Sequence, residues 1–313
     1  MPLRLLRHHQ LDLLAWDACV AQARQAVPYA QSWWLAATAG RWDAVVEIGK
    51  RDEYVSVLPL PVKRRPWGRE VHQPPFTQQL GLLTTAASHH LNLLDYLPLL
   101  PGRYTRLYTQ LHTKQELVSA PPGFKLAERC TYQLSLAPAY SQLFSGYTAE
   151  FRRRLRKNQS QPRPLTVTET QDVQDIVTLF QQEKGKSTSL RRRHYQQLTK
   201  LVAALQSRRL AYILEVRHPA TNTLLAGALF VRYAEGYIYL FAGASAEGKK
   251  AHGPQLLLNH VIQQHAGSPG QVLDFEGGMI PSIARFFANF GAVPVPYAVL
   301  SFTQRPWYLQ WMR

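Results

Sequence analysis

The chain has 313 residues, of which 46% are hydrophobic, and only two of its residues are cysteines. This length and apolar content suit two domains with cores of their own. Two cysteines, Cys19 and Cys130, cannot form a disulfide framework and lack metal-ligand spacing, so we expect a reducing, cytoplasmic location. We predict no signal peptide and no membrane span, because no apolar run is long enough.

The formal net charge of +16 is unevenly distributed. Residues 1–150 contain 15 Lys and Arg against 11 Asp and Glu, a balance of +4. Residues 151–313 contain 21 against 9, a balance of +12. A basic half predicts an anionic partner, such as a phosphorylated co-substrate or RNA. A soluble basic surface without such a partner is the alternative.

Hydrophobic periodicity in the first half predicts a mixture of strands and helices. A proline-containing loop at 74–81 and a hairpin loop around 63–67 interrupt them. The predicted strands are 3–6, 44–48, 54–61, 104–109 and 132–136, and the predicted helices are 11–26, 30–38 and 87–97.

The second half has a clearer pattern, which opens with a long basic helix over residues 139–159. Three strands with short connections then predict an antiparallel meander. The predicted strands are 165–168, 210–217, 224–233, 236–244, 272–275 and 295–303, and the later helices are 171–184, 190–206, 254–266 and 280–290.

The predicted order of the second half is β-α-α-β-β-β-α-β-α-β, and the first half shows a blurred version of it. Three stretches resemble motifs of FemABX-like transferases, which belong to the GNAT acyltransferase superfamily. They are Phe144–Pro164 (FSGYTAEFRRRLRKNQSQPRP), Val272–Tyr297 (VLDFEGGMIPSIARFFANFGAVPVPY) and Pro75–Gly81 (PFTQQLG). The resemblance implies an α/β chain of two GNAT-like domains in tandem, 1–138 and 139–313, each a mixed sheet flanked by helices.

The resemblance also implies an activity. FemABX proteins transfer an aminoacyl group from charged tRNA to an amine of a peptidoglycan precursor, and relatives of similar build are thought to use acyl-CoA. We therefore expect an N-acyltransferase or aminoacyltransferase whose donor is acyl-CoA or aminoacyl-tRNA. In GNAT proteins the fourth strand and third helix bracket that donor. The donor-binding candidates are Phe241, Ala242, Gly243, Lys249, Lys250, His252 and Gly253.

Two positions depart from the GNAT pattern. Gln255 stands where the phosphate-binding loop usually has a second small residue, so an ordinary solvated loop is as good an interpretation of this segment. Phe287 stands where a tyrosine often protonates the leaving thiolate. The phenylalanine at this position argues against standard acetyl-CoA chemistry.

Asp274 and Glu276 are the catalytic candidates, since alternation along a strand would place both carboxylates on one face. Two neighbouring carboxylates can raise the pKa of one of them and so provide a general base. The alternative is that one of them caps the helix that starts near Pro281.

Basic residues are the substrate-binding candidates, because arginine suits phosphate. A solvated helix face or an exposed hairpin is the alternative for each group. We add one polar residue from each of two motifs. The candidates are Arg152, Arg153, Arg156, Lys63, Arg64, Gln78 and Tyr297. No metal site is predicted, because the adjacent histidine pairs lack further ligands.

Two other functions remain open. The first is a binding module that has kept the fold and lost the chemistry, with RNA or a nucleotide-linked ligand as its partner. The second is RNA binding without transfer, for which affinity would fall steeply with salt and substitutions in 152–154 would flatten that dependence.

Overall fold

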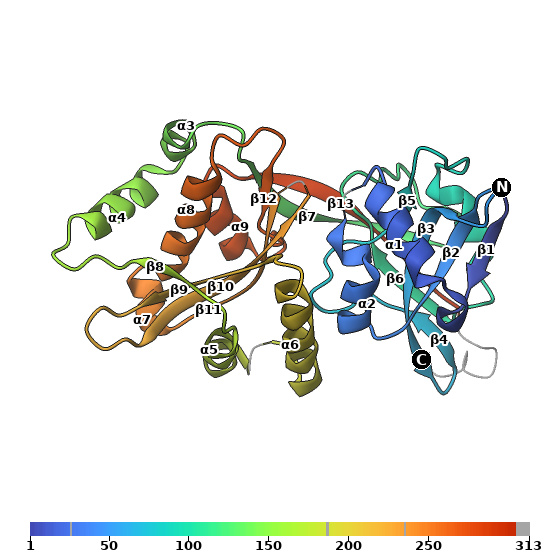
Figure 1. The fold of residues 1–313 in the computed structure, drawn as a ribbon, viewed down its shortest axis with the longest axis horizontal. Helices are drawn as coiled ribbons and strands as arrows, with labels where there is room; N and C mark the ends of the chain where they lie inside the picture. The colour runs from blue at the N-terminus through green and yellow to red at the C-terminus, as the bar shows by residue number, and fades with distance from the viewer. Residues whose placement is uncertain (26, 186–187, 235, 305–313) are drawn as a thin grey trace. The chain divides into compact units, whose positions relative to one another are not determined.

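The computed structural model describes residues 1–25, 27–185, 188–234 and 236–304. The chain forms two compact units (Figure 1). Unit 1 contains residues 1–129 and the chain from Pro296 onward, and unit 2 contains residues 130–295. The predicted boundary after residue 138 differs from this division, because two long strands each contribute to both units. They are β7 (Lys125–Ser135) and β13 (Val293–Thr303).

Unit 1 is a mixed sheet with strand order β1-β2-β3-β4-β6-β13, and β5 pairs with β3. In the described part of unit 1, two α-helices and four 3-10 helices accompany the sheet. The elements are β1 (Leu3–Leu6), η1 (His8–Gln10), α1 (Leu13–Gln22), η2 (Pro28–Ala30), α2 (Ser32–Thr38), β2 (Trp42–Ile48), β3 (Tyr54–Arg65), β4 (Gly68–Val71), β5 (Leu83–Thr84), η3 (Leu93–Asp95), η4 (Leu97–Leu99) and β6 (Arg106–Gln110).

Two predictions for unit 1 were wrong. The helix expected at 87–97 is replaced by η3 and η4, because the buried Glu47 carboxylate accepts hydrogen bonds from the backbone N–H groups of His89 and His90. The loop expected around Lys63 is instead the paired end of β3, with Lys63 opposite Glu70 of β4.

Unit 2 is a mixed sheet with strand order β7-β12-β11-β10-β9-β8. The predicted order of elements is confirmed, and one short helix, α7, was not expected. The elements are α3 (Tyr140–Ser145), α4 (Ala149–Gln159), β8 (Val167–Thr170), α5 (Gln174–Lys184), α6 (Arg192–Gln206), β9 (Ala211–Arg217), β10 (Leu224–Tyr233), β11 (Gly236–Ala244), α7 (Ala246–Lys250), α8 (Gly253–His265), β12 (Val272–Asp274) and α9 (Pro281–Ala288).

The predicted helix over 139–159 is broken into α3 and α4 (Figure 1). The break follows Gly146, whose N–H closes α3 on the carbonyl groups of Gln142 and Leu143. Thr148 N–H then bonds to Asn289 O at 3.0 Å, which ties the start of α4 to the end of α9. Tyr147 and Phe151 are buried in the core, as predicted.

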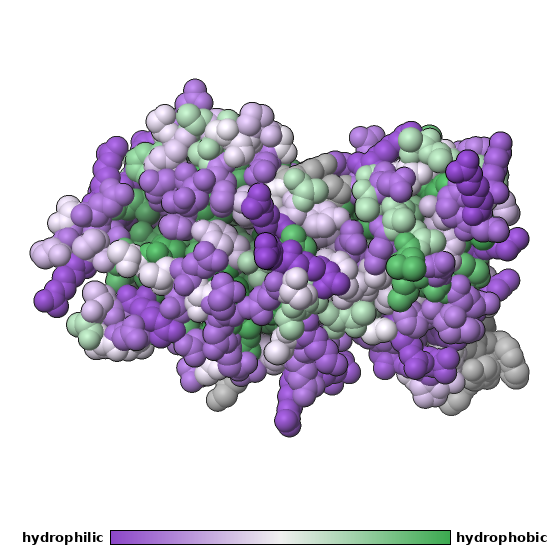
Figure 2. All heavy atoms as spheres, in the orientation of Figure 1, coloured by the Kyte–Doolittle hydropathy of each residue, from purple (hydrophilic) through white to green (hydrophobic). Residues whose placement is uncertain are grey.

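Helices cover both faces of the unit 2 sheet, and alternate residues of β10 show which helix lies on which face. Gly227 faces α5, because a Cβ there would lie 2.5 Å from Ile176 Cγ1. Ala226 and Ala228 belong to the apolar cluster that includes α8 and α9. Hydrophilic side chains gather over the region of α4 in Figure 2, as the five Lys and Arg residues between 152 and 157 require.

Candidate functional site

The central feature of unit 2 is a parallel pair of strands that separates after three residues. Gly236, Tyr237 and Ile238 of β11 pair with Val272, Leu273 and Asp274 of β12. Strand β11 continues to Ala244, whereas β12 ends at Asp274. Residues 239–244 of β11 therefore have no β12 partner.

A β-bulge lies at the point of separation. Leu229 and Phe230 of β10 are consecutive, yet they pair with Phe241 and Tyr239, so Leu240 is the extra residue on β11. A bulge leaves one residue out of the ladder and turns the strand locally. The bulge thus adds a change of direction to β11 where its pairing with β12 ends.

The turn after β12 holds Asp274 firmly. Its oxygens accept hydrogen bonds from Thr131 Oγ1 at 2.5 Å, from Gln133 Nε2 at 2.8 Å and from the Glu276 N–H at 2.8 Å. Burial raises the pKa of Asp274, and these three hydrogen bonds oppose the rise. Asp274 therefore fixes the turn on β7.

Asp274 and Glu276 do not belong to one continuous strand, contrary to the prediction that placed both carboxylates on one strand face. Strand β12 ends at Asp274. Glu276 has a φ of 51°, in the left-handed region, so strand alternation does not define its direction. Pairing continues only as far as the Phe275 N–H, which donates to Tyr132 O at 2.9 Å.

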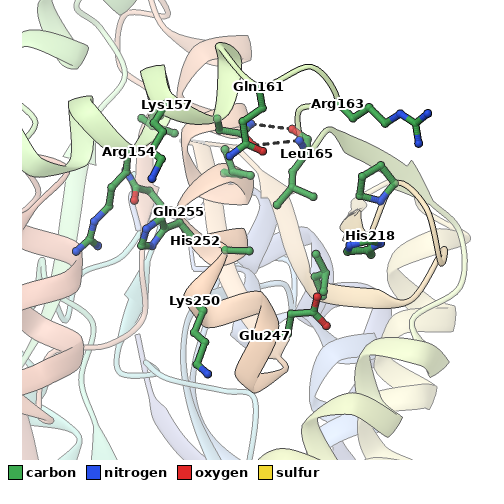
Figure 3. Close-up of a pocket in the computed structure, with 16 residues that line it drawn as sticks. Arg154, Lys157, Gln161, Arg163, Leu165, His218, Glu247, Lys250, His252 and Gln255 are labelled. Atoms are coloured by element: carbon green, nitrogen blue, oxygen red, sulfur yellow. Dashed lines mark hydrogen bonds between the residues drawn. The ribbon is translucent and has the colours of Figure 1, made fainter.

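A basic cavity of about 440 Å³ lies at the start of α8 (Figure 3). It is lined by α4, the β9–β10 turn, α7 and α8, and it contains two of the predicted donor-binding residues, Lys250 and His252. The charged and histidine side chains of its lining are Arg154, Lys157, Arg163, His218, Glu247, Lys250 and His252. Because Glu247 is the one carboxylate among these side chains, the cavity suits an anion.

Local packing explains the residues at the start of α8, where His252 and Gly253 stand. His252, with a φ of 60°, precedes α8, and burial followed by the nearby Arg154 lowers the pKa of its imidazole. A Cβ on Gly253 would lie 2.8 Å from Ala226 Cβ, so α8 begins directly on β10.

Gln255 replaces the expected small residue for a structural reason. It is 2% exposed, and its Nε2 donates to Phe151 O at 2.8 Å, which links α8 to α4. Its Oε1 is buried and has no hydrogen-bond partner among the described residues.

The other donor-binding candidates are distributed over both faces of the sheet. Phe241 and Gly243 face α5: the Phe241 ring lies 4.8 Å from that of Phe180, and a Cβ on Gly243 would meet Ile176 O at 3.1 Å. Ala242 packs with the cluster on the α8 side. Lys249 forms an ion pair of 3.2 Å with Glu183 and is not in the lining of the basic cavity.

Arg152, Arg153 and Arg156 line a second, more open cavity of about 550 Å³ along α4. Arg152 also stabilises the junction of α3 and α4, since its Nη1 donates to the carbonyl groups of Ser145 and Tyr147. Arg153 and Arg156 are exposed. The three predicted residues thus share one helix face.

The remaining candidates belong to unit 1. Lys63 and Arg64 pair with β4 at Glu70 and Arg69, and Gln78 Oε1 accepts a hydrogen bond from Gln79. Tyr297 is buried, and its hydroxyl donates to Gln110 Oε1 at 3.2 Å. These residues form no single site within unit 1.

Sequence analysis assigned no role of its own to Tyr239. Its ring lies 6.2 Å from that of Phe287 and perpendicular to it, beside the separation of β11 from β12. Within the described residues its hydroxyl makes no hydrogen bond, and desolvation raises its pKa, so it is protonated at neutral pH. A tyrosine in the middle of an apolar strand gave no signal beyond the missing hydroxyl at position 287.

Among the described residues no group of His, Cys, Asp and Glu could hold a metal ion. In the same part of the chain, no helix is both long and apolar enough to cross a membrane.

Comparison with known proteins agrees with this geometry. Residues 145–280 match the family model of the acetyltransferase (GNAT) domain. The chain has the mixed α/β fold of a tandem GNAT protein, as the motif resemblance implied. Comparison with curated proteins gave no match.

The solved structures that are similar extend this likeness to the whole chain. The crystal structure of FemX matches with a TM-score of 0.70 and 13% identity over 100% of both chains. A tandem GNAT protein from the clavulanic acid biosynthesis pathway matches with a TM-score of 0.55 and 15% identity, over 97% of this chain and 99% of that one. L-PGS from Bacillus licheniformis matches with 0.55 and 11%, over 95% and 94%.

Proposed function

We propose that this protein is an N-acyltransferase or aminoacyltransferase whose reaction takes place beside β11 in unit 2. The observation that supports this most is the separation of β11 from β12 after Ile238 and Asp274. It leaves backbone N–H and C=O groups of 239–244 able to hold an extended acyl donor by strand-like hydrogen bonds.

The proposed reaction forms one amide bond. The amine nitrogen attacks the carbonyl carbon of a thioester or ester, and the carbonyl π electrons move to its oxygen. When this tetrahedral intermediate collapses, the bond to sulfur or oxygen breaks and the leaving group takes that electron pair. The amine loses a proton, and the leaving group gains one. Positioning of the two reactants supplies much of the rate in such reactions.

Three residues around the turn have distinct proposed roles. Asp274 is a positioning residue, because its oxygens are occupied by Thr131, Gln133 and the Glu276 N–H. Glu276, the next carboxylate, is the proposed base that accepts the amine proton. Tyr239 is the proposed donor of a proton to the leaving group, since it has the hydroxyl that Phe287 lacks.

The proposed donor is anionic, and its phosphate lies in the basic cavity by Lys250 and His252. Tyr239 is a weak acid, because desolvation raises its pKa, and this favours an ester donor such as aminoacyl-tRNA. A thiol has a pKa of about 8.5 and is a stronger acid than this tyrosine, so a thiolate gains little from its proton. An alkoxide leaving group is far more basic and needs that proton. Acyl-CoA remains the second donor to be tested.

The decisive experiment follows product formation by mass spectrometry with acyl-CoA thioesters and aminoacyl-tRNA, each supplied with a panel of amines. We expect turnover with one donor class. Glu276→Gln and Tyr239→Phe should each lower kcat by about 10²-fold. Glu128→Gln, an exposed carboxylate of unit 1, is the matched control and should retain activity. Full activity of both site variants would contradict the assigned roles.

A binding module without catalysis is the second candidate, and the buried Phe287 in place of a proton donor favours it. The same panel separates the two candidates. Saturable donor binding with no product from any amine would establish the binding module and refute the transferase.

A further inference from the structure

Unit 1 contains a basic cavity that the proposed transfer reaction does not use. Its volume is about 540 Å³. The lining comes from η1, from the turn that precedes β2 and from β2, β3 and β4. It consists of Arg7, His8, His9, Gly40, Arg41, Asp43, Val62, Arg64 and Arg69.

A buried carboxylate orients two of these arginines. The Asp43 side chain is 2% exposed, and its Oδ2 accepts from Arg7 Nη1 at 2.7 Å and from Arg69 Nη1 at 3.0 Å. Tyr104 OH donates to the same oxygen at 3.0 Å, and the His8 N–H donates to Oδ1 at 3.2 Å. Because a guanidinium has five N–H donors, each arginine keeps donors that Asp43 does not use.

The cavity lining has an excess of positive charge. Arg41 and Arg64 are exposed at its rim and form no ion pair within the described residues. Four arginines against Asp43 leave three net positive charges, with both histidines counted as neutral. His8 adds a buried Nδ1 for which the described part of the chain provides no hydrogen-bond partner. A solvated surface would not need two guanidiniums anchored on a buried carboxylate.

We propose that this cavity binds a diphosphate group. Two fixed guanidinium forks suit phosphate oxygens, because arginine donates in parallel pairs. A diphosphate has two to three negative charges at neutral pH, which match the three net positive charges of the lining, whereas a single phosphate does not. The site is independent of the transfer reaction, because it lies entirely in unit 1 and its occupancy is measured without turnover.

The test is calorimetric titration of the full chain with inorganic pyrophosphate, orthophosphate, sulfate, UDP and ADP at constant ionic strength. We expect pyrophosphate to bind at least tenfold more tightly than orthophosphate or sulfate. The nucleotides identify the source of the group: tighter binding of either one than of pyrophosphate assigns a nucleoside diphosphate, and equal binding assigns the diphosphate alone. Equal affinity for sulfate and pyrophosphate would overturn the proposal.

Variants locate the binding. The double variant Arg41→Gln/Arg64→Gln should weaken pyrophosphate binding at least tenfold. The control Arg51→Gln/Arg103→Gln removes the same charge from exposed positions of unit 1 outside the lining, and it should change the affinity less than twofold. Equal weakening by both pairs would show a general charge effect and refute the site.

Arg69→Lys tests the oriented fork, since it keeps the charge and loses the planar donor pair. We expect at least fivefold weaker pyrophosphate binding, with an unchanged Tm showing that unit 1 is folded. Undiminished binding by this variant would contradict the role of the Asp43-anchored guanidinium.

Discussion

Each unit contains a parallel pair of strands, and the two units differ in what lies beside the end of that pair. In unit 2, β11 and β12 pair over three residues, and 239–244 of β11 then lack a β12 partner. In unit 1, β4 and β6 pair at Glu70–Arg106 and Val71–Leu107. There the chain after β4 returns to β6, with Leu80 N–H bonded to Gln110 O at 2.8 Å.

Glutamine side chains complete the closure in unit 1. Gln73 Oε1 accepts the Gln110 N–H at 3.0 Å, and Gln79 Oε1 accepts the Thr113 N–H at 3.0 Å. The backbone groups of Gln110 and Thr113, at the end of β6, are therefore bonded within the chain. In unit 1 the chain after β4 fills the space beside β6, whereas in unit 2 residues 239–244 of β11 have no β12 partner. This difference supports our placing the proposed reaction in unit 2.

The strongest way to break the comparison is to disturb the parallel pair of unit 2. Gly236 has a φ of 143°, and a Cβ there would lie 1.9 Å from Val272 O. Gly236→Ala should lower the free energy of unfolding by about 3 kcal/mol, because strain and the clash with β12 add. Urea denaturation measures the loss.

Gly270→Ala is the matched control for that substitution. Gly270 also has a positive φ, of 78°, but nothing lies within 4 Å of its Cβ position. It should cost about 1 kcal/mol, the strain alone. Equal losses in the two variants would show that the contact between β11 and β12 does not depend on Gly236.

We expect acid to lower the stability of unit 1 through His112, which is bonded to Leu82. His112 is 3% exposed, its Nε2 donates to Leu82 O at 2.9 Å, and burial lowers its pKa from 6.5 to about 4. The folded state resists protonation while the unfolded state accepts it. Stability is therefore fully present above pH 6.5, and about 3 kcal/mol is lost as the pH falls to 4.

The measurement is urea denaturation at a series of pH values, for the natural chain and for His112→Gln, which keeps an N–H donor for Leu82 O. The variant should lose stability less steeply between pH 6.5 and 4. Parallel curves would mean that His112 does not contribute to the acid sensitivity.

The smallest loss of stability should come from removing the Gln73 side chain, which accepts the Gln110 N–H beside β6. Gln73→Ala leaves the Gln110 N–H without its acceptor, at a cost of about 1 to 3 kcal/mol. Hydrogen exchange at the Gln110 amide should become at least several-fold faster. Gln22→Ala, at an exposed position of α1, is the control and should leave that amide unchanged. Unaltered exchange in Gln73→Ala would show that the Gln73 side chain does not protect the Gln110 amide.

Sequence patterns predicted unit 2 well because its signals are local. The bounds of β10 and β11 were predicted to the residue, since turn residues flank alternating apolar strands. The interruption of the helix over 139–159 was missed, because it depends on a contact between Thr148 and Asn289, far apart in sequence. Glu47 overrides the helical pattern at 87–97 for the same reason.

The candidate site was predicted less completely. Lys250 and His252, predicted to bind an anionic donor, line a basic cavity, whereas the oxygens of Asp274 accept hydrogen bonds from residues of β7. The positions of Gln255 and Tyr239 depend on tertiary packing. Gln255 is bonded to Phe151, and the ring of Tyr239 lies against that of Phe287. A single sequence does not show which residues meet across helices and strands, so their roles emerged only in three dimensions.

The exchange of the two long strands has a consequence for biosynthesis. Residues 299–303 of β13 pair with 106–110 of β6 in unit 1, and 133–135 of β7 pair with 272–274 of β12 in unit 2. On a ribosome, the edge of β6 therefore emerges nearly 190 residues before its neighbour is translated. Unit 1 therefore cannot complete its sheet until the end of the chain has been translated, after all of unit 2.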